Sequence, residues 1–120
     1  MNYESKIKTI EWQNGQVRLI DQTKLPYKFE YVNITSSNQM GDAIRDMIVR
    51  GAPAIGIAGA FGLVLGAMEI VDSQDKKSFL AKLEKIGEYL KLVRPTAVNL
   101  MWAVDKQLNF AKSLITTPAV

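Results

Sequence analysis

The spacing of apolar residues changes at Ser36, and this change limits the chain to a fold in which a small sheet precedes helices. Before Ser36 apolar and polar residues alternate as in a half-buried strand, and after it apolar residues recur every three or four positions. Strands followed by helices predict an α+β fold, without a parallel Rossmann-like sheet. We expect an antiparallel sheet of about three strands in residues 1–35 and a bundle of about four helices in residues 36–120.

A β-hairpin is predicted at Asn14-Gly15, which lies between two apolar runs. The two-residue turn sets the strand register as Gln13–Gln16, Trp12–Val17, Glu11–Arg18 and Ile10–Leu19. The apolar pairs then share one face of the hairpin, and the charged pair lies on the other. After a break at Leu25-Pro26, β-branched and aromatic residues predict a third strand over residues 28–34.

The first predicted helix begins at a capping box formed by Ser36 and Gln39. It should end near Arg50-Gly51, because glycine adopts the left-handed conformation that stops a helix. Its inward face is expected to be Met40, Ala43, Ile44, Met47 and Ile48.

Three further helices are expected. The second starts at Pro53 and runs to about Val71, and residues 71–77 form a loop. The third is amphipathic, with Phe79, Leu80, Leu83, Ile86 and Leu90 inward. The fourth opens at Arg94-Pro95, and its inner face is Ala97, Met101, Val104, Leu108, Ala111 and Ile115.

Residues 52–68 carry no charged side chain and are close to the shortest length that can span a bilayer. A buried core helix is the favoured interpretation, because the stretch also contains a proline and glycines at 56, 59, 62 and 66. Each glycine costs roughly 1 kcal/mol of helix propensity relative to alanine. We therefore expect these glycines to admit neighbouring backbones closely.

The composition excludes several kinds of chemistry. The chain has no cysteine and no histidine, which excludes a disulfide, a thiolate nucleophile, a Cys/His zinc site and an imidazole base. We therefore expect no metal and no cofactor. A net charge of 15 − 12 = +3 is too small to indicate nucleic acid. Neither a membrane nor a nucleic acid is an expected partner.

Two arginines precede predicted helix starts, Arg50 before Gly51-Ala52-Pro53 and Arg94 before Pro95. A helix N-terminus presents free N–H groups and a partial positive charge, and arginine adds a bidentate cationic group. The pattern predicts a site for an anionic, phosphorylated small ligand. The alternative is that each arginine caps the helix before it and is otherwise solvated, since such glycine-proline segments are ordinary turns.

Other candidates have structural explanations. Asp42, Arg45 and Asp46 fit charge pairs on a solvated helix face. Trp102 is expected in the core, and Asp105 shows no partner. Lys76-Lys77 and the charged face of the third helix are expected to be solvated surface. Asn99 lies about one turn after Arg94 and is a possible ligand contact.

Long ungapped segments resemble methylthioribose-1-phosphate isomerases over about residues 7–111. The segments are residues 42–56 (DAIRDMIVRGAPAIG), 94–100 (RPTAVNL) followed by Trp102-Ala103, 9–12 (TIEW) and 19–26 (LIDQTKLP). The wider superfamily includes ribose-1,5-bisphosphate isomerase and regulatory subunits of the translation-initiation exchange factor.

The resemblance implies an aldose–ketose isomerase of methionine salvage and amino-acid biosynthesis, which converts 5-methylthioribose 1-phosphate to 5-methylthioribulose 1-phosphate. Such an enzyme must open the sugar ring and move hydrogen between C1 and C2. The resemblance assigns contacts with this sugar phosphate to Arg50, Gly51, Ala52 and Arg94. It also implies a cytoplasmic enzyme that is a homodimer at full length.

The family's catalytic pair is a cysteine and an aspartate in a C-terminal Rossmann-like domain. The chain contains no cysteine, and we expect it to be the N-terminal domain of a longer two-domain enzyme, with no catalytic residue of its own and no activity alone. A related sugar-phosphate isomerase of the ribose 1,5-bisphosphate type and a non-enzymatic regulatory module are the alternatives.

Overall fold

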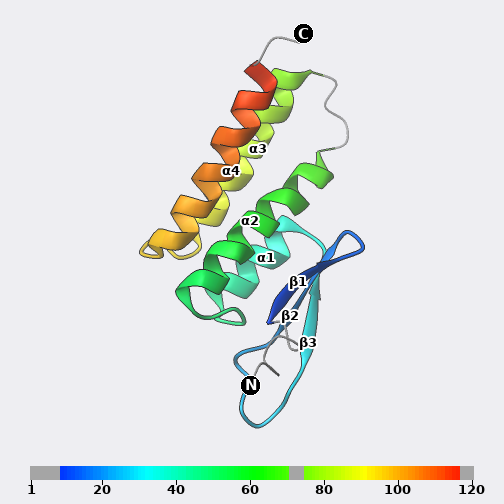
Figure 1. The fold of residues 1–120 in the computed structure, drawn as a ribbon, viewed down its shortest axis with the longest axis vertical. Helices are drawn as coiled ribbons and strands as arrows, with labels where there is room; N and C mark the ends of the chain where they lie inside the picture. Colours follow the sequence, from blue (N-terminus) through cyan, green and yellow to red (C-terminus); the bar gives the residue numbers. More distant parts are fainter. Residues whose placement is uncertain (1–8, 71–74, 117–120) are drawn as a thin grey trace, which may run out of the picture.

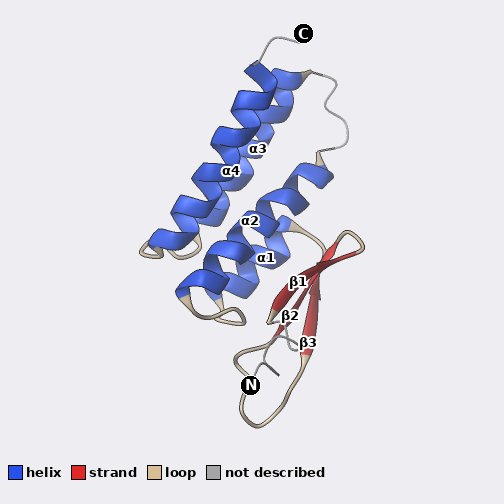
Figure 2. Ribbon diagram, in the orientation of Figure 1, coloured by secondary structure: helices blue, strands red, loops and turns tan. Residues whose placement is uncertain are grey.

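The chain folds into a small sheet followed by four helices, as the sequence predicts (Figures 1 and 2). The computed structural model describes residues 9–70 and 75–116. In chain order the described elements are β1 (Ile10–Gln13), β2 (Gln16–Ile20), β3 (Tyr31–Ile34), α1 (Ser37–Arg45), α2 (Ala52–Glu69), α3 (Lys76–Leu92) and α4 (Val98–Thr116). Figure 1 shows the sheet at one end of an elongated molecule, with α3 and α4 reaching furthest from it.

The sheet is antiparallel in the order β1-β2-β3, and the hairpin has the predicted register. Asn14 and Gly15 have φ values of 51° and 81°, the positive values that a two-residue hairpin turn requires. Val17 and Leu19 are fully buried on the face toward the helices. The predicted charged pair is in register, but the Arg18 guanidinium lies over the ring of Tyr31, 3.6 Å from its centroid.

The third strand is shorter than predicted because residues 28–30 belong to the preceding loop. Buried Asp21 organises this loop by accepting hydrogen bonds from the N–H and hydroxyl of Thr23, at 2.9 and 2.5 Å. The Asp21 N–H donates to the carbonyl of Glu30, which joins the two ends of the loop at the point where β3 begins.

Helix α1 begins as predicted but ends at Arg45, five residues before the predicted Arg50 (50 − 45). Met47 has a φ of 65°, so the chain leaves the helix here, and the N–H groups of Ile48 and Val49 both donate to the Ala43 carbonyl. This turn buries Val49, but it leaves Met47 exposed, contrary to the prediction. The resulting loop carries Arg50 to the start of α2.

Helix α2 is the centre of the bundle, and its glycines face its neighbours. A Cβ at Gly59 would overlap Leu100 of α4, and one at Gly66 would lie 2.7 Å from Ile86 of α3. At Gly62 it would lie 3.0 Å from Met40 of α1. The glycines therefore allow close packing, but at these three positions the neighbours are side chains. The predicted close approach of a backbone is found at Gly56, where a Cβ would lie 3.3 Å from the Asn99 carbonyl oxygen. Although α2 is long and apolar enough to cross a membrane, 44% of that helix is buried within this bundle.

Helices α3 and α4 pack against each other and against α2. Leu83 and Leu90 are buried as predicted, and Leu100 is a fully buried core residue that the helical pattern missed. Trp102 was expected in the core, but 63% of it is exposed. Trp102 faces outward because the face of α4 that packs on α2 and α3 is formed by Leu100, Val104 and Leu108.

A carboxylate from the end of α2 holds the start of α1. The Glu69 carboxylate accepts hydrogen bonds from the N–H and the hydroxyl of Ser37, at 2.6 and 3.3 Å, and Ser37 is buried. A negative charge at this place also complements the N-terminal end of the helix dipole.

We expect Glu69→Gln to lower the free energy of unfolding by about 1 kcal/mol, because the amide keeps an acceptor oxygen but loses the charge. Urea unfolding monitored by circular dichroism measures this loss. Glu84→Gln is the matched control, since the Glu84 carboxylate has no hydrogen bond or ion pair within the described ranges, and it should change stability by less than about 0.5 kcal/mol. An equal effect of both variants would contradict the role of Glu69.

Candidate functional site

The two arginines singled out from the sequence line one hollow. We define the arginine hollow by Arg50, Gly51, Ala52, Arg94, Val98 and Asn99, and its volume is about 360 Å³. It lies where the loop after α1, the start of α2 and the turn before α4 meet. Residues that are more than forty positions apart in the sequence are therefore neighbours in space.

Gly51 is the N-cap of α2, not the end of α1 as predicted. Its φ of 95° and ψ of 134° favour glycine, and no side chain caps the helix here. The first N–H groups of α2 consequently have neither an intrahelical partner nor a side-chain cap. Together with the partial positive charge of the helix end, they favour an anion at this side of the hollow.

Arg94 does not directly precede α4, contrary to the prediction. The helix begins at Val98, and Arg94 lies in a separate turn in which the Ala97 N–H donates to the Arg94 carbonyl, at 2.9 Å. Pro95 follows Arg94 in this turn, before the helix begins. The turn places Arg94 on the same hollow as Arg50.

Neither arginine caps a helix in the structure. Within residues 9–70 and 75–116, the guanidinium groups of Arg50 and Arg94 form no hydrogen bond and no ion pair. The described lining of the hollow also includes no carboxylate. The hollow thus has two unpaired cations and free helix N–H groups, an arrangement suited to a phosphate.

Five lining residues were missed as site candidates from the sequence: Met47, Ile55, Thr96, Ala97 and Val98. Met47 and Thr96 line the arginine hollow, Met47 because its left-handed turn ends α1 early and Thr96 because it follows Arg94 in the same turn. Val98 lines it from the first position of α4. The proximity of Thr96 to Arg94 in the sequence was a usable signal, whereas nothing in the sequence indicated the turn at Met47.

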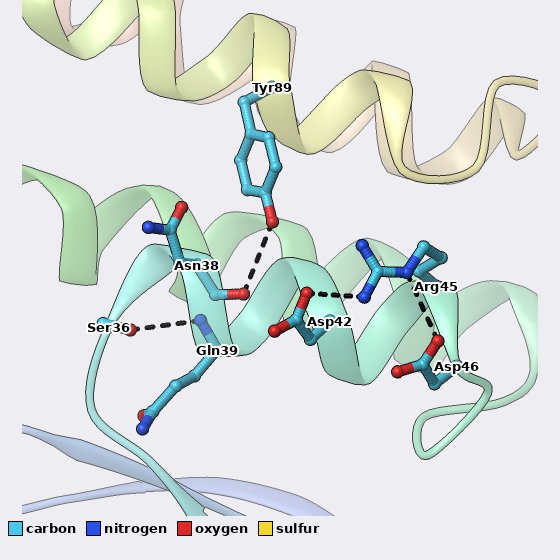
Figure 3. Close-up of polar contacts among 7 residues, drawn as sticks. All are labelled: Ser36, Asn38, Gln39, Asp42, Arg45, Asp46 and Tyr89. Atoms are coloured by element: carbon cyan, nitrogen blue, oxygen red, sulfur yellow. Dashed lines mark hydrogen bonds and ion pairs between the residues drawn. The ribbon is translucent and has the colours of Figure 1, made fainter.

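The charged cluster on α1 is a surface ion-pair group (Figure 3). Arg45 contacts Asp42 at 2.7 Å and Asp46 at 3.3 Å, as the spacing predicts. Hydrogen bonding to Asp46, followed by the charge of Asp42, raises the pKa of Arg45, so the guanidinium stays charged. Burial, followed by the charge of Asp42, raises the pKa of Tyr89, whose hydroxyl donates to the Asn38 carbonyl at 3.4 Å.

Asp105, which showed no partner in the sequence, accepts a hydrogen bond from Lys91 across the α3–α4 interface at 2.8 Å. This hydrogen bond, followed by the one that Lys91 donates to the Glu88 carboxylate, raises the pKa of Lys91. Both partners of this interaction lie outside the arginine hollow. No group of three metal-ligating side chains occurs within the described parts of the chain.

Asn99 lies at the edge of the arginine hollow and also lines a second hollow between α2 and α4. We define this tryptophan groove by Gly56, Ile57, Ala60, Asn99, Trp102 and Lys106, and its volume is about 380 Å³. The Lys106 ammonium lies 4.8 Å from the centroid of the Trp102 ring. The groove therefore adds an apolar surface beside the cationic hollow.

The amino-acid sequence of this chain is similar to those of known proteins. A model of the initiation factor 2 subunit family matches residues 48–118. The methylthioribose-1-phosphate isomerase of Trichormus variabilis is 51% identical over 108 residues, which are 90% of this chain and 31% of that protein. The isomerase of Desulforamulus reducens is 54% identical over 99 residues, which are 82% of this chain and 28% of that protein.

Two solved structures share the fold. The crystal structure of 5-methylthioribose 1-phosphate isomerase from Pyrococcus horikoshii OT3 has a TM-score of 0.85 and 40% identity, over 92% of this chain and 31% of that one. The delta subunit of translation initiation factor eIF-2B from A. fulgidus has a TM-score of 0.79 and 41% identity, over 86% and 30%. The chain spans less than a third of the length of these relatives.

Proposed function

Because this chain belongs to the initiation factor 2 subunit family and is homologous to methylthioribose-1-phosphate isomerases, we propose that it is the part of such an isomerase that binds the substrate's phosphate. The observation that carries the proposal is the arginine hollow, in which Arg50 and Arg94 line one cavity without an acidic partner among the described residues. The substrate in this proposal is 5-methylthioribose 1-phosphate.

The electrostatics of the hollow support a doubly charged oxyanion. Two guanidinium groups can each donate two parallel hydrogen bonds to phosphate oxygens. The uncapped N–H groups at the start of α2 add neutral donors, and Gly51 presents no side chain that would keep a ligand from the backbone. A phosphate ester matches these donors better than a carboxylate, because it offers three oxygens and more charge.

The phosphate contacts should act mainly on binding. The aldose and the ketose carry the same phosphate, so these contacts stabilise substrate, transition state and product to a similar extent. Their main effect is then on affinity and on positioning C1 and C2 for the reaction. The chain has no histidine or cysteine, and the described residues of the hollow include no carboxylate to move a proton. We therefore assign proton transfer to residues beyond this chain.

A titration of the chain followed by NMR tests this proposal. We expect 5-methylthioribose 1-phosphate to shift the amide signals of Gly51 and Ala52, and 5-methylthioribose without its phosphate to leave them unchanged. An assay of ketose formation with the same sample should show no turnover. Absence of phosphate-dependent shifts at these residues would reject the phosphate site, and turnover by the chain alone would reject the assignment of proton transfer.

A regulatory module is the second candidate, and the archaeal initiation-factor subunit supports it. That structure is 41% identical to this chain, compared with 40% for the solved isomerase. The curated relatives named as isomerases are more similar, at 48 to 54% identity. This difference favours the isomerase, and the NMR titration separates the two, since a purely structural module need not select a phosphorylated sugar.

A further inference from the structure

The tryptophan groove adjoins the arginine hollow, and Ala52 and Asn99 line both. The volumes of the two hollows, about 380 and 360 Å³, lie at the lower end of the range typical of small-molecule sites. Because they share lining residues, the two hollows lie next to each other.

The close approach of α2 to α4 forms the boundary between the two hollows. A Cβ at Gly56 would lie 3.3 Å from the Asn99 carbonyl oxygen, tighter than an ordinary contact. The absence of this Cβ lets the backbones meet beside Asn99. Further along, the helices present Ile57 and Trp102, which are 46% and 63% exposed, as apolar walls.

The lining is cationic in the arginine hollow, polar at the boundary and mostly apolar in the tryptophan groove. Arg50 and Arg94 make the first hollow cationic, and Asn99 stands between the hollows. The Asn99 side-chain amide, which can donate and accept, forms no hydrogen bond with any residue in the described ranges. Beyond it lie the indole of Trp102 and the aliphatic side chain of Ile57.

We propose that one ligand spans both hollows, with its phosphate at the arginines, its hydroxyls at Asn99 and an apolar group at C5 against Trp102. This inference rests on the proposed function and adds the determinant of substrate choice. In 5-methylthioribose 1-phosphate the phosphate, the hydroxyls and the methylthio group follow one another from C1 to C5, which is the order of the lining. A thioether packs well on an aromatic ring.

The groove then selects a sugar phosphate by what it carries at C5. An apolar C5 group gains contact with Trp102 and Ile57, whereas a hydroxyl there gains little. A second phosphate at C5 would be placed against apolar walls, with Lys106 as the one cation lining the described groove. From the discrimination that apolar pockets achieve for one small group, we expect a preference of about ten-fold for the methylthio sugar.

Affinities of the chain for three ligands test the inference: 5-methylthioribose 1-phosphate, ribose 1-phosphate and ribose 1,5-bisphosphate. The wild-type chain should bind the methylthio sugar about ten-fold more tightly than ribose 1-phosphate. Trp102→Ala should reduce this ratio to nearly one, and Trp102→Phe should retain most of it. Thermal melting of each variant checks folding, which the exposure of Trp102 should leave intact.

Trp12→Ala is the matched control, because Trp12 is also partly exposed but contacts Phe61 outside the groove. It should leave the ratio unchanged and make Trp102 the sole reporter of tryptophan fluorescence. A wild-type ratio near one, an equal loss for both ligands in Trp102→Ala, or tightest binding of the bisphosphate would overturn the inference. If Arg50→Ala leaves the affinity for 5-methylthioribose 1-phosphate unchanged, the proposed phosphate site is wrong instead. Failure of the proposed function can therefore be distinguished from failure of the proposed role of the tryptophan groove.

Discussion

We expect Arg50→Ala and Arg94→Ala each to weaken binding of 5-methylthioribose 1-phosphate to the chain by about ten-fold to a hundred-fold. Each substitution removes a charge-assisted contact worth roughly 1.5–3 kcal/mol, and each 1.4 kcal/mol is a factor of ten in affinity. Titration by NMR or calorimetry at low ionic strength measures the change. Arg50→Lys should recover only part of it, because lysine keeps the charge but cannot form two parallel hydrogen bonds.

Lys82→Ala is the control for loss of a positive charge. Lys82 is exposed on α3 and lines neither hollow, so its removal should leave affinity unchanged. The melting temperatures of the arginine variants should stay near that of the wild type, since their guanidinium groups have no partner within the described residues. Early melting with normal affinity would instead make the arginines structural and place the phosphate elsewhere.

The largest expected effect on stability comes from Leu100, the fully buried residue opposite Gly59. Leu100→Ala should lower the free energy of unfolding by about 2–5 kcal/mol through lost burial and a cavity. Gly59→Ala forces a methyl group against the Leu100 Cδ1 atom, and overpacking of about 1–3 kcal/mol outweighs the gain of about 1 kcal/mol in helix propensity.

The double variant Gly59→Ala/Leu100→Ala should be more stable than the sum of the two losses predicts, by about 1 kcal/mol or more, because the added methyl group occupies space that Leu100 leaves. Chemical unfolding of the four proteins gives this coupling. Gly66→Ala combined with Leu100→Ala is the control, because position 66 faces Ile86 instead and the two losses should add. Additive losses for the Gly59 pair would show that the contact with Leu100 is not what destabilises Gly59→Ala.

Local rules predicted the sheet and most of the helices. Asn14-Gly15 specified a turn whose geometry allows one register, and that register is observed. The glycines of α2 were correctly assigned to close packing, since four costly residues in an apolar helix require a reason. These features depend on neighbours in sequence or on one helix, so a single sequence contains the information.

The differences arise where tertiary contacts decide. Met47 fits the apolar face of α1, but the turn that buries Val49 takes Met47 out of the helix. Trp102 is of a residue type that is usually buried, yet it is exposed. The packing of Leu100 against Gly59 sets the rotation of α4 and turns Trp102 outward. The predicted site residues Arg50, Gly51, Ala52, Arg94 and Asn99 do line one hollow, and their ligand contacts stay a prediction.

The glycines of α2 also determine when this helix can form. Summed over four positions, roughly 4 kcal/mol opposes the helix in a free chain, so the segment has little helical structure of its own. Contacts with α1, α3 and α4 must supply the missing stability, and each glycine becomes favourable only once its partner is in place. The central helix is therefore the element least able to fold first, and its dependence on all three neighbours makes the bundle fold and unfold as one cooperative unit.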